Sequence, residues 1–333
     1  MGHFLGLSGT GHRLLAVGVG VAIALSLQPA ADAGILDFLF GRRDTRGRPT
    51  GREQGGAVRS GRLLGGDNPA IPFILTPRNT FHLDDHFMIE WHPVVGVDSY
   101  TVRLWRWDDA YGERDWLVWE TQTDQTAVIY NGEIPLQPAR FYSVEVITDT
   151  GISSDLDTGC ASIGFALLFE ENRNRLRQQL EAVDLNDPQV SLQLADIYLN
   201  NGMVDYAITA LEQEAVTTSD PRLHLALAEL YSLAGLNQAA LDQYHQAKSL
   251  GAIQFDLMMQ AMALEGIGSV QSTQLKIDAA IDSLQTAERF YRAEAADLPA
   301  QRLAQRIENL QRFPQDLAAQ GATGHCQPPN DQD

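Results

Sequence analysis

The chain has 333 residues, an apolar fraction of 44% and a formal net charge of −19. This length suits about two domains, and the apolar fraction is that of a folded protein rather than a disordered one. Residues 67–165 hold five Arg against sixteen acidic residues, and residues 166–333 hold eleven Lys or Arg against twenty-three. Because such acidic surfaces repel phosphate backbones, we expect no nucleic-acid binding by these two stretches.

Residues 1–33 have the pattern of a secretory signal peptide. One basic residue, Arg13, precedes an apolar run from Leu14 to Leu27, and the small residues that follow favour cleavage after Ala33. The run is short for a membrane span, which needs about 20 apolar residues. We therefore predict a periplasmic or secreted protein. A retained N-terminal anchor is the alternative, and it would supply the chain's membrane contact.

Residues 34–66 hold seven arginines against three acidic residues, and their composition predicts a flexible Gly/Arg-rich linker. At the other end, residues 321–333 predict a disordered tail. The two cysteines of the chain are Cys160 and Cys326. In an oxidising compartment they form a disulfide bond or remain two thiols, and the sequence leaves both alternatives open.

Residues 67–165 alternate apolar and polar side chains with a period of two and are broken by turns, which predicts an all-β sandwich. In residues 86–92 the bulky apolar side chains fall on one face and polar side chains on the other: Phe87, Ile89 and Trp91 against His86, Glu90 and His92. Alternate residues of a strand can bind zinc, but this spacing matches no recognised ligand set. A solvated face explains the pattern as well, and we expect no metal.

Three segments of this stretch resemble a fibronectin type III domain: Ile89–Pro93, Gly96–Val102 and Tyr142–Ser153. In that family the tryptophan belongs to the second strand and the two tyrosines to the third and sixth strands. The resemblance covers residues 67–165. It departs from the family in the long hairpin between Trp105 and Trp119.

Four of the five tryptophans lie in that hairpin: Trp105, Trp107, Trp116 and Trp119. If Tyr100 and Leu104 face the core, Trp105 and Trp107 point outward. Exposed aromatic residues are enriched at interfaces, and their flat rings can stack on sugars. The hairpin is therefore a surface patch for an external ligand, a contact with the helical region, or part of the core.

Helical periodicity begins near residue 166 and contains two stretches that repeat at an offset of 33 residues. Leu194, Ala195, Tyr198, Gly202 and Ala207 recur as Leu227, Ala228, Tyr231, Gly235 and Ala240. A period of this length is typical of stacked helix pairs. The two stretches resemble tetratricopeptide repeats, which implies an all-α region over residues 166–320.

The tetratricopeptide resemblance also implies a groove along the first helix of each repeat. Its inner-face positions fall on Gln189, Leu192, Asp196 and Asn200 in the first repeat and on Arg222, Leu225, Glu229 and Ser232 in the second. A polar, acid-leaning groove of this kind suits an extended peptide or a partner helix. The alternative is an array so short that it stacks only on the sandwich and on itself.

No metalloprotease, nucleophile-elbow, phosphate-loop or dinucleotide motif occurs after residue 33. Two Asp-Thr-Gly triplets resemble those of aspartic proteases, but Asp149 and Asp157 are too close in sequence to lie in two lobes. We expect no catalytic residue and no cofactor. The sequence favours an exported scaffold of the bacterial envelope that binds a protein or peptide in the groove. The alternative is a carbohydrate or cell-wall binding module that uses the tryptophan hairpin.

Overall fold

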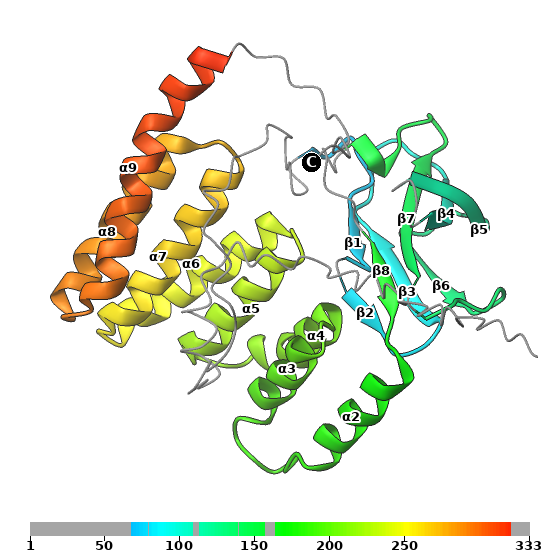
Figure 1. Ribbon diagram of the computed structural model, residues 1–333, viewed down its shortest axis with the longest axis horizontal. Coiled ribbons are helices and arrows are strands. Elements are labelled where there is room, and N and C mark those ends of the chain that lie inside the picture. The colour runs from blue at the N-terminus through cyan, green and yellow to red at the C-terminus, as the bar shows by residue number, and fades with distance from the viewer. Residues whose placement is uncertain (1–67, 79, 109–112, 139, 157–163, 321–333) are drawn as a thin grey trace, which may run out of the picture.

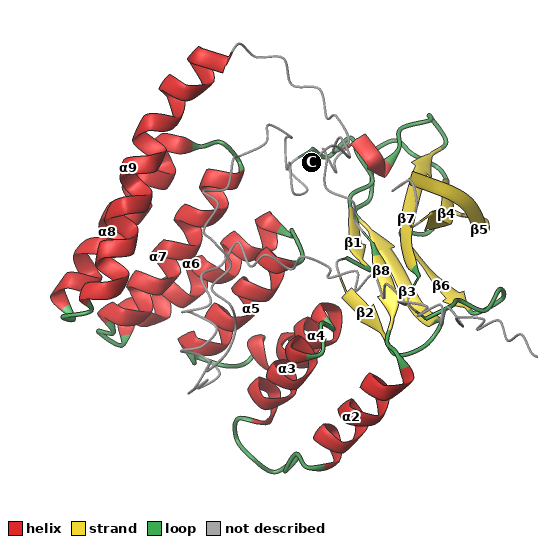
Figure 2. Cartoon of the chain, in the orientation of Figure 1, coloured by secondary structure: helices red, strands yellow, loops and turns green. Residues whose placement is uncertain are grey.

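The computed structural model describes residues 68–78, 80–108, 113–138, 140–156 and 164–320. In these ranges a β region, residues 74–167, is followed by eight helices (Figure 2). Residues 1–33, the linker, the tail, Cys160 and Cys326 lie outside the described residues, as do the predictions made for them. Within the described ranges, no helix combines the length and apolar content that a bilayer crossing requires.

The β region contains two sheets. The three-stranded sheet has the order β1-β3-β6, formed by Ile74–Thr76, His86–Trp91 and Ala127–Asn131. The five-stranded sheet has the order β2-β8-β7-β4-β5, formed by Thr80–His82, Phe165–Leu167, Phe141–Thr148, Tyr100–Asp108 and Glu113–Thr123. β2 pairs with β8 in parallel, and the other paired strands are antiparallel.

One apolar core fills the space between the two sheets. Ile89 and Trp91 of β3 meet Val102 and Leu104 of β4 there, and all four are at most 1% exposed. Burying a side chain of this size stabilises the fold by about 1.5–3 kcal/mol. The predicted alternation in β3 is confirmed, because Phe87, Ile89 and Trp91 are buried and the intervening residues, Met88 among them, face away from the core.

The helices follow the β region in an arc that runs from α2, next to the sheets, to α9 at the far end (Figure 1). From α3 onward each helix packs against the next. Their bounds are α2 Glu170–Glu181, α3 Val190–Asn200, α4 Val204–Ala215, α5 Pro221–Leu233, α6 Asn237–Ile253, α7 Leu257–Thr273, α8 Ile277–Ala293 and α9 Asp297–Gln320.

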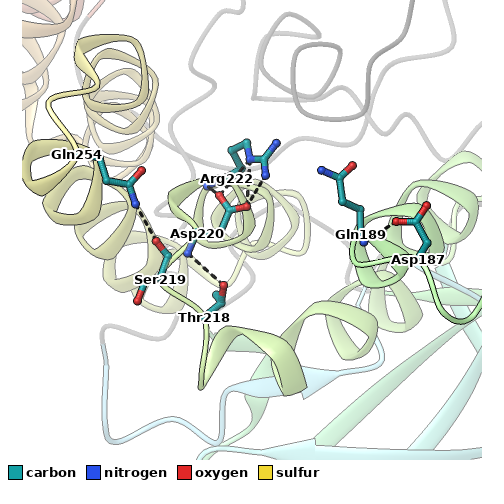
Figure 3. Close-up of polar contacts among 7 residues, drawn as sticks. All are labelled: Asp187, Gln189, Thr218, Ser219, Asp220, Arg222 and Gln254. Atoms are coloured by element: carbon teal, nitrogen blue, oxygen red, sulfur yellow. Dashed lines mark hydrogen bonds and ion pairs between the residues drawn. The ribbon is translucent and has the colours of Figure 1, made fainter.

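Two Asp-Pro pairs, Asp187-Pro188 and Asp220-Pro221, precede α3 and α5, and each aspartate accepts the N–H of the residue two positions on (Figure 3). A carboxylate oxygen of Asp187 accepts the backbone N–H of Gln189 at 2.7 Å, and Asp220 accepts that of Arg222 at 2.9 Å. Asp220 is the N-cap of α5, and a cap of this kind contributes about 1 kcal/mol, because it satisfies an N–H that the first turn leaves without a partner. Asp187 lies two residues before the N-cap of α3, Gln189, which makes no side-chain cap. Asp220 also forms an ion pair with the guanidinium of Arg222, with an NH2–Oδ2 distance of 2.6 Å.

The turns between helices share one geometry but change their spacing. Gly202 (φ 72°) and Gly235 (φ 75°) end α3 and α5, and the next three left-handed residues follow at intervals of 20: Phe255, Leu275 and Ala295. At each turn the following N–H bonds to a carbonyl five residues back, for example Leu236 to Tyr231 at 2.8 Å. This is the usual hydrogen bond of a left-handed helix end. The 33-residue spacing is thus confined to α3–α6, and α6, α7 and α8 have 17 residues each.

Candidate functional site

The segment that joins β1 to β2 runs across the two repeated turns. The backbone N–H of Phe81 donates to the carbonyl of Gly202 at 3.0 Å, and Arg78 Nε donates to the carbonyl of Ala234 at 2.6 Å. A Cβ atom added to Gly202 would lie 2.7 Å from the Phe81 ring, and one added to Gly235 would lie 3.1 Å from the Arg78 guanidinium. Glycine at both positions therefore allows the positive φ without strain and leaves room for the β region to approach the turn.

Buried side chains fix this joint. Arg78 is 6% exposed, donates from NH1 to the carbonyl of Ile74 at 2.8 Å and lies 4.3 Å above the centre of the Phe73 ring. Phe73 itself packs in the apolar cluster of the helices, beside Ala195 and Leu211. The two regions thus share a packed interface, so the surfaces on either side of it are held in a defined geometry.

A cleft of about 1090 Å³ lies beside the joint. Its β wall is the outer face of β3, with His86, Met88, Glu90 and His92. Its helical wall comes mainly from α4, which contributes Glu212, and is extended by residues of α3 and by residues of α6 such as Asp242. The face of β3 that the sequence assigned to solvent is therefore one wall of a cleft between the two regions.

His82 and Asp205 lie together where this cleft meets the joint. His82 is 4% exposed, and its Nε2 is 3.8 Å from Asp205 Oδ2, which is too long for a hydrogen bond. The His82 ring packs against Phe87, with the ring centres 4.8 Å apart. Asp205 Oδ2 accepts the Thr76 hydroxyl at 2.7 Å. Within the described residues, neither ring nitrogen of His82 has a hydrogen-bond partner.

Burial moves the pKa values of this pair in opposite directions. It lowers the pKa of His82 to about 4, against the opposing effect of the Asp84 charge. It raises the pKa of Asp205 to about 7, although hydrogen bonds from Thr76 and the Arg78 backbone and the charge of Arg78 oppose the shift. Desolvation disfavours the charged form of each group. Near pH 5–6 the imidazole is therefore neutral and the proton resides on the carboxyl group.

The cleft combines acceptors with aromatic surface. Four carboxylate residues line it, and none of its described lining residues is Lys or Arg: the four are Glu90, Asp205, Glu212 and Asp242. Tyr231 donates its hydroxyl to Glu212 at 2.7 Å. In the part of the chain that the structure describes, no group of three or more His, Cys, Asp or Glu residues is placed to hold a metal ion. The arrangement suits a ligand that donates hydrogen bonds.

The predicted groove on the first helices is wrong at two of its central positions. Leu225 and Glu229 are 0% exposed. Leu225 belongs to an apolar cluster that also contains residues of α6 and α7. Glu229 accepts the hydroxyl of the buried Tyr244 at 2.6 Å, so its side chain faces α6 rather than solvent.

The other predicted groove residues remain at least partly accessible. Gln189, Asn200 and Arg222 are exposed, whereas Leu192, Asp196 and Ser232 are half-buried. None of the eight predicted groove residues is among those that line the cleft.

The tryptophan patch is also corrected. Trp119 is 9% exposed and belongs to the core of the β region, with its Nε1–H donating to Glu133 at 2.9 Å. Trp105 and Trp107 lie on the opposite face of the sheet, half-buried, and donate to Glu145 at 3.0 Å and Ser143 at 2.8 Å. Only Trp116 of the four is largely exposed, at 60%. Figure 1 places β4 and β5 away from the helices, so the predicted hairpin–helix contact is not formed by these strands.

The acidic residues of the helical wall were missed by sequence reasoning. Asp205, Glu212 and Asp242 lie on the second helix of each repeat, whereas the family resemblance directs attention to the first. Glu90 and His92 were noted as a shared polar face, but nothing in the sequence places α4 opposite them. The one signal available in the sequence was the outward face of β3, whose polar residues alternate with the buried residues Phe87, Ile89 and Trp91.

Comparisons with known proteins assign no family to this chain. A scan against models of known protein families finds no match, and a search of curated proteins finds no relative.

Proposed function

We propose that this is an exported, non-enzymatic interaction protein of the bacterial envelope that binds a segment of a partner protein in the cleft between its two regions. The β region is taken as fibronectin type III-like, and the helices as a short tetratricopeptide-like array. The signal-like pattern of residues 1–33 and the 33-residue repeat motivate these assignments. Both folds are scaffolds that commonly present binding surfaces rather than reactive groups.

The cleft itself carries the proposal. Its volume of about 1090 Å³ is slightly above the range of about 300–1,000 Å³ that is usual for small-molecule pockets, so it has room for a short peptide segment. Its lining contains apolar side chains such as Met88 and Leu194 as well as carboxylates. Apolar contacts and hydrogen bonds are the two kinds of contact that protein–protein interfaces combine. Because the joint fixes both walls, the surface is formed before a partner arrives, which lowers the entropic cost of binding.

A photo-crosslinking amino acid tests the location. It is placed at Gln213, which lines the cleft, and separately at Asn200, which is exposed on the predicted first-helix groove. After irradiation in envelope preparations, we expect adducts with a defined partner peptide from position 213 and few from position 200. Adducts from position 200 alone would place binding on the helical groove. The absence of protein adducts from both positions would contradict an interaction role for either surface.

One observation supports a second candidate function, that of a carbohydrate-binding module. Trp116 is exposed, and the Arg106 guanidinium lies 5.5 Å from the centre of its ring. An exposed indole next to a hydrogen-bond donor suits a sugar ring. Binding to an envelope polysaccharide that Trp116→Ala abolishes, with cleft variants unaffected, would favour this candidate over the cleft.

A further inference from the structure

The charge on the cleft walls is one-sided. Glu90 on the β wall faces a helical wall that carries Glu212 and Asp242, and no lining residue among those described offers a compensating Lys or Arg. Carboxylates grouped between low-dielectric walls focus a negative potential and concentrate cations there. The same negative potential repels partner proteins whose binding segments are acidic.

Two buried acceptors lie where the cleft meets the joint. His82 lines the cleft, is 96% buried and has no hydrogen-bond partner on either ring nitrogen within the described chain. Its Nε2 and the Asp205 carboxylate are 3.8 Å apart. The unprotonated nitrogen of a neutral imidazole is an acceptor, and so is the Asp205 carboxylate once it ionises above its pKa of about 7. A planar guanidinium presents several N–H donors in a fixed fork. A buried polar group without a partner is unfavourable, so a ligand that supplies donors here gains affinity.

Aromatic rings line the approach to this pair. The Tyr206 ring packs 5.7 Å from the His82 ring and 5.5 Å from the Tyr198 ring, measured between centres. Both tyrosines line the cleft. Aromatic faces attract cations and cover the methylene stem of an arginine side chain. His82 and Asp205 can therefore contact the guanidinium of an arginine, while the neighbouring tyrosine rings contact its methylene stem.

We infer that the cleft binds an extended, arginine-bearing segment of a partner protein, with a guanidinium directed at His82 and Asp205 and the flanking residues held between Glu90 and Glu212. The inference rests on the proposed function and adds the chemistry of the partner. The commitment to an external partner follows from charge complementarity along both walls. Residues 41–66 of the chain itself, with seven arginines, are the competing occupant.

The test uses the full exported chain and three synthetic ten-residue peptides that are identical except for three positions holding Arg, Gln or Glu. Fluorescence anisotropy at low and at moderate salt gives their affinities. We expect the Arg peptide to bind at least tenfold more tightly than the Gln peptide, and a threefold rise in salt to weaken it. Equal binding of the Arg and Gln peptides would overturn the charge assignment and leave the proposed function standing. If no peptide binds while cleft crosslinks to a partner persist, the assignment of arginine also fails.

Paired variants locate the binding. Glu90→Gln with Glu212→Gln is expected to lower the affinity for the Arg peptide about tenfold, since both changes keep the side-chain shape and remove the charge. Glu294→Gln, an exposed position at the end of α8, is the matched control and is expected to have no effect. Equal losses from both variants would show that general charge, not the cleft, binds the peptide, and would overturn the inference.

Replacing the seven arginines of residues 41–66 with serine tests whether this segment of the chain, rather than an external partner, occupies the cleft. An unchanged affinity for the Arg peptide supports an external partner. A tenfold gain in affinity would show that the chain's own segment fills the cleft, and would overturn the assignment to a partner.

Discussion

The turns at Gly202 and Gly235 differ from the later turns at Phe255, Leu275 and Ala295. All five place a residue in the left-handed region, but of these five only the first two carry glycine. Within the described residues, it is these two turns that receive hydrogen bonds from the β region, at Gly202 and at the neighbouring Ala234. The later turns pay the usual backbone cost of a side chain in that region, about 1–2 kcal/mol each. Glycine is thus retained where another part of the chain approaches the backbone, and the 33-residue repeat marks a docking surface within the molecule.

The largest effect should come from a side chain added at a docked turn. Gly202→Ala introduces left-handed strain of about 1–2 kcal/mol and a Cβ atom 2.7 Å from the Phe81 ring, which adds overpacking of about 1–3 kcal/mol. We expect the free energy of unfolding in urea to fall by about 3 kcal/mol.

Two matched variants separate docking from turn geometry. Gly235→Ala should cost less, because its Cβ atom meets the end of the Arg78 side chain at 3.1 Å. Ala295→Gly at a later turn should be neutral or stabilise by roughly 0.5 kcal/mol, since relief of strain is offset by the added freedom of glycine in the unfolded chain. A loss at Gly202 no larger than the usual left-handed penalty would contradict the difference between the turns.

The titrating pair at the docked turn gives the next prediction. The raised pKa of Asp205, about 7, favours folding at low pH, and this stability is lost as pH rises from about 4 to about 7. The lowered pKa of His82, about 4, favours folding above pH 6.5, and this stability is lost as pH falls toward 4. Between about pH 4 and 6.5 the two contributions offset each other, because the folded state binds its proton on Asp205 and the unfolded state on His82.

Asp205→Asn should expose the contribution of His82 alone. Relative to the unsubstituted protein, the variant should lose about 1.4 kcal/mol of unfolding free energy for each pH unit between 6.5 and 4. Urea unfolding of both proteins at pH 6.5 and pH 5.0 measures this, with an expected extra loss of about 2 kcal/mol at the lower pH. The same difference at both pH values would show that the two groups do not exchange a proton on folding.

The sequence was informative wherever the pattern is local. The alternation in residues 86–92 predicted both the buried face of β3 and the polar face that forms a wall of the cleft. The change to helical periodicity near residue 166 correctly predicted helices after the β region. Such features depend on neighbours in the chain, and their physical chemistry can be read from a few residues.

Contacts between distant segments were not readable. Glu229 occupies a position that the family resemblance assigns to the groove, but it is buried and accepts the hydroxyl of Tyr244 in α6. This contact depends on how the helices pack rather than on neighbours in the chain. For the hairpin that holds Trp119, the sequence left open a surface patch, a contact with the helices and the core. The register of β5 shifts between the partners of Leu104 and Trp105, so alternation counted along β4 cannot place Trp119. The docking of Arg78 and Phe81 on the helices carries no sequence signal apart from the two glycines.

A double-mutant cycle between Gly202→Ala and Phe81→Ala tests most directly whether the β region docks on the repeated turns. Removing the Phe81 ring takes away the contact that the new methyl group would meet, whereas the left-handed strain at residue 202 remains. We expect the double variant to be more stable than the sum of the single losses by about 1 kcal/mol or more, the coupling typical of residues in contact. Additivity within about 0.5 kcal/mol would show that the two residues act independently, and would contradict docking at this turn.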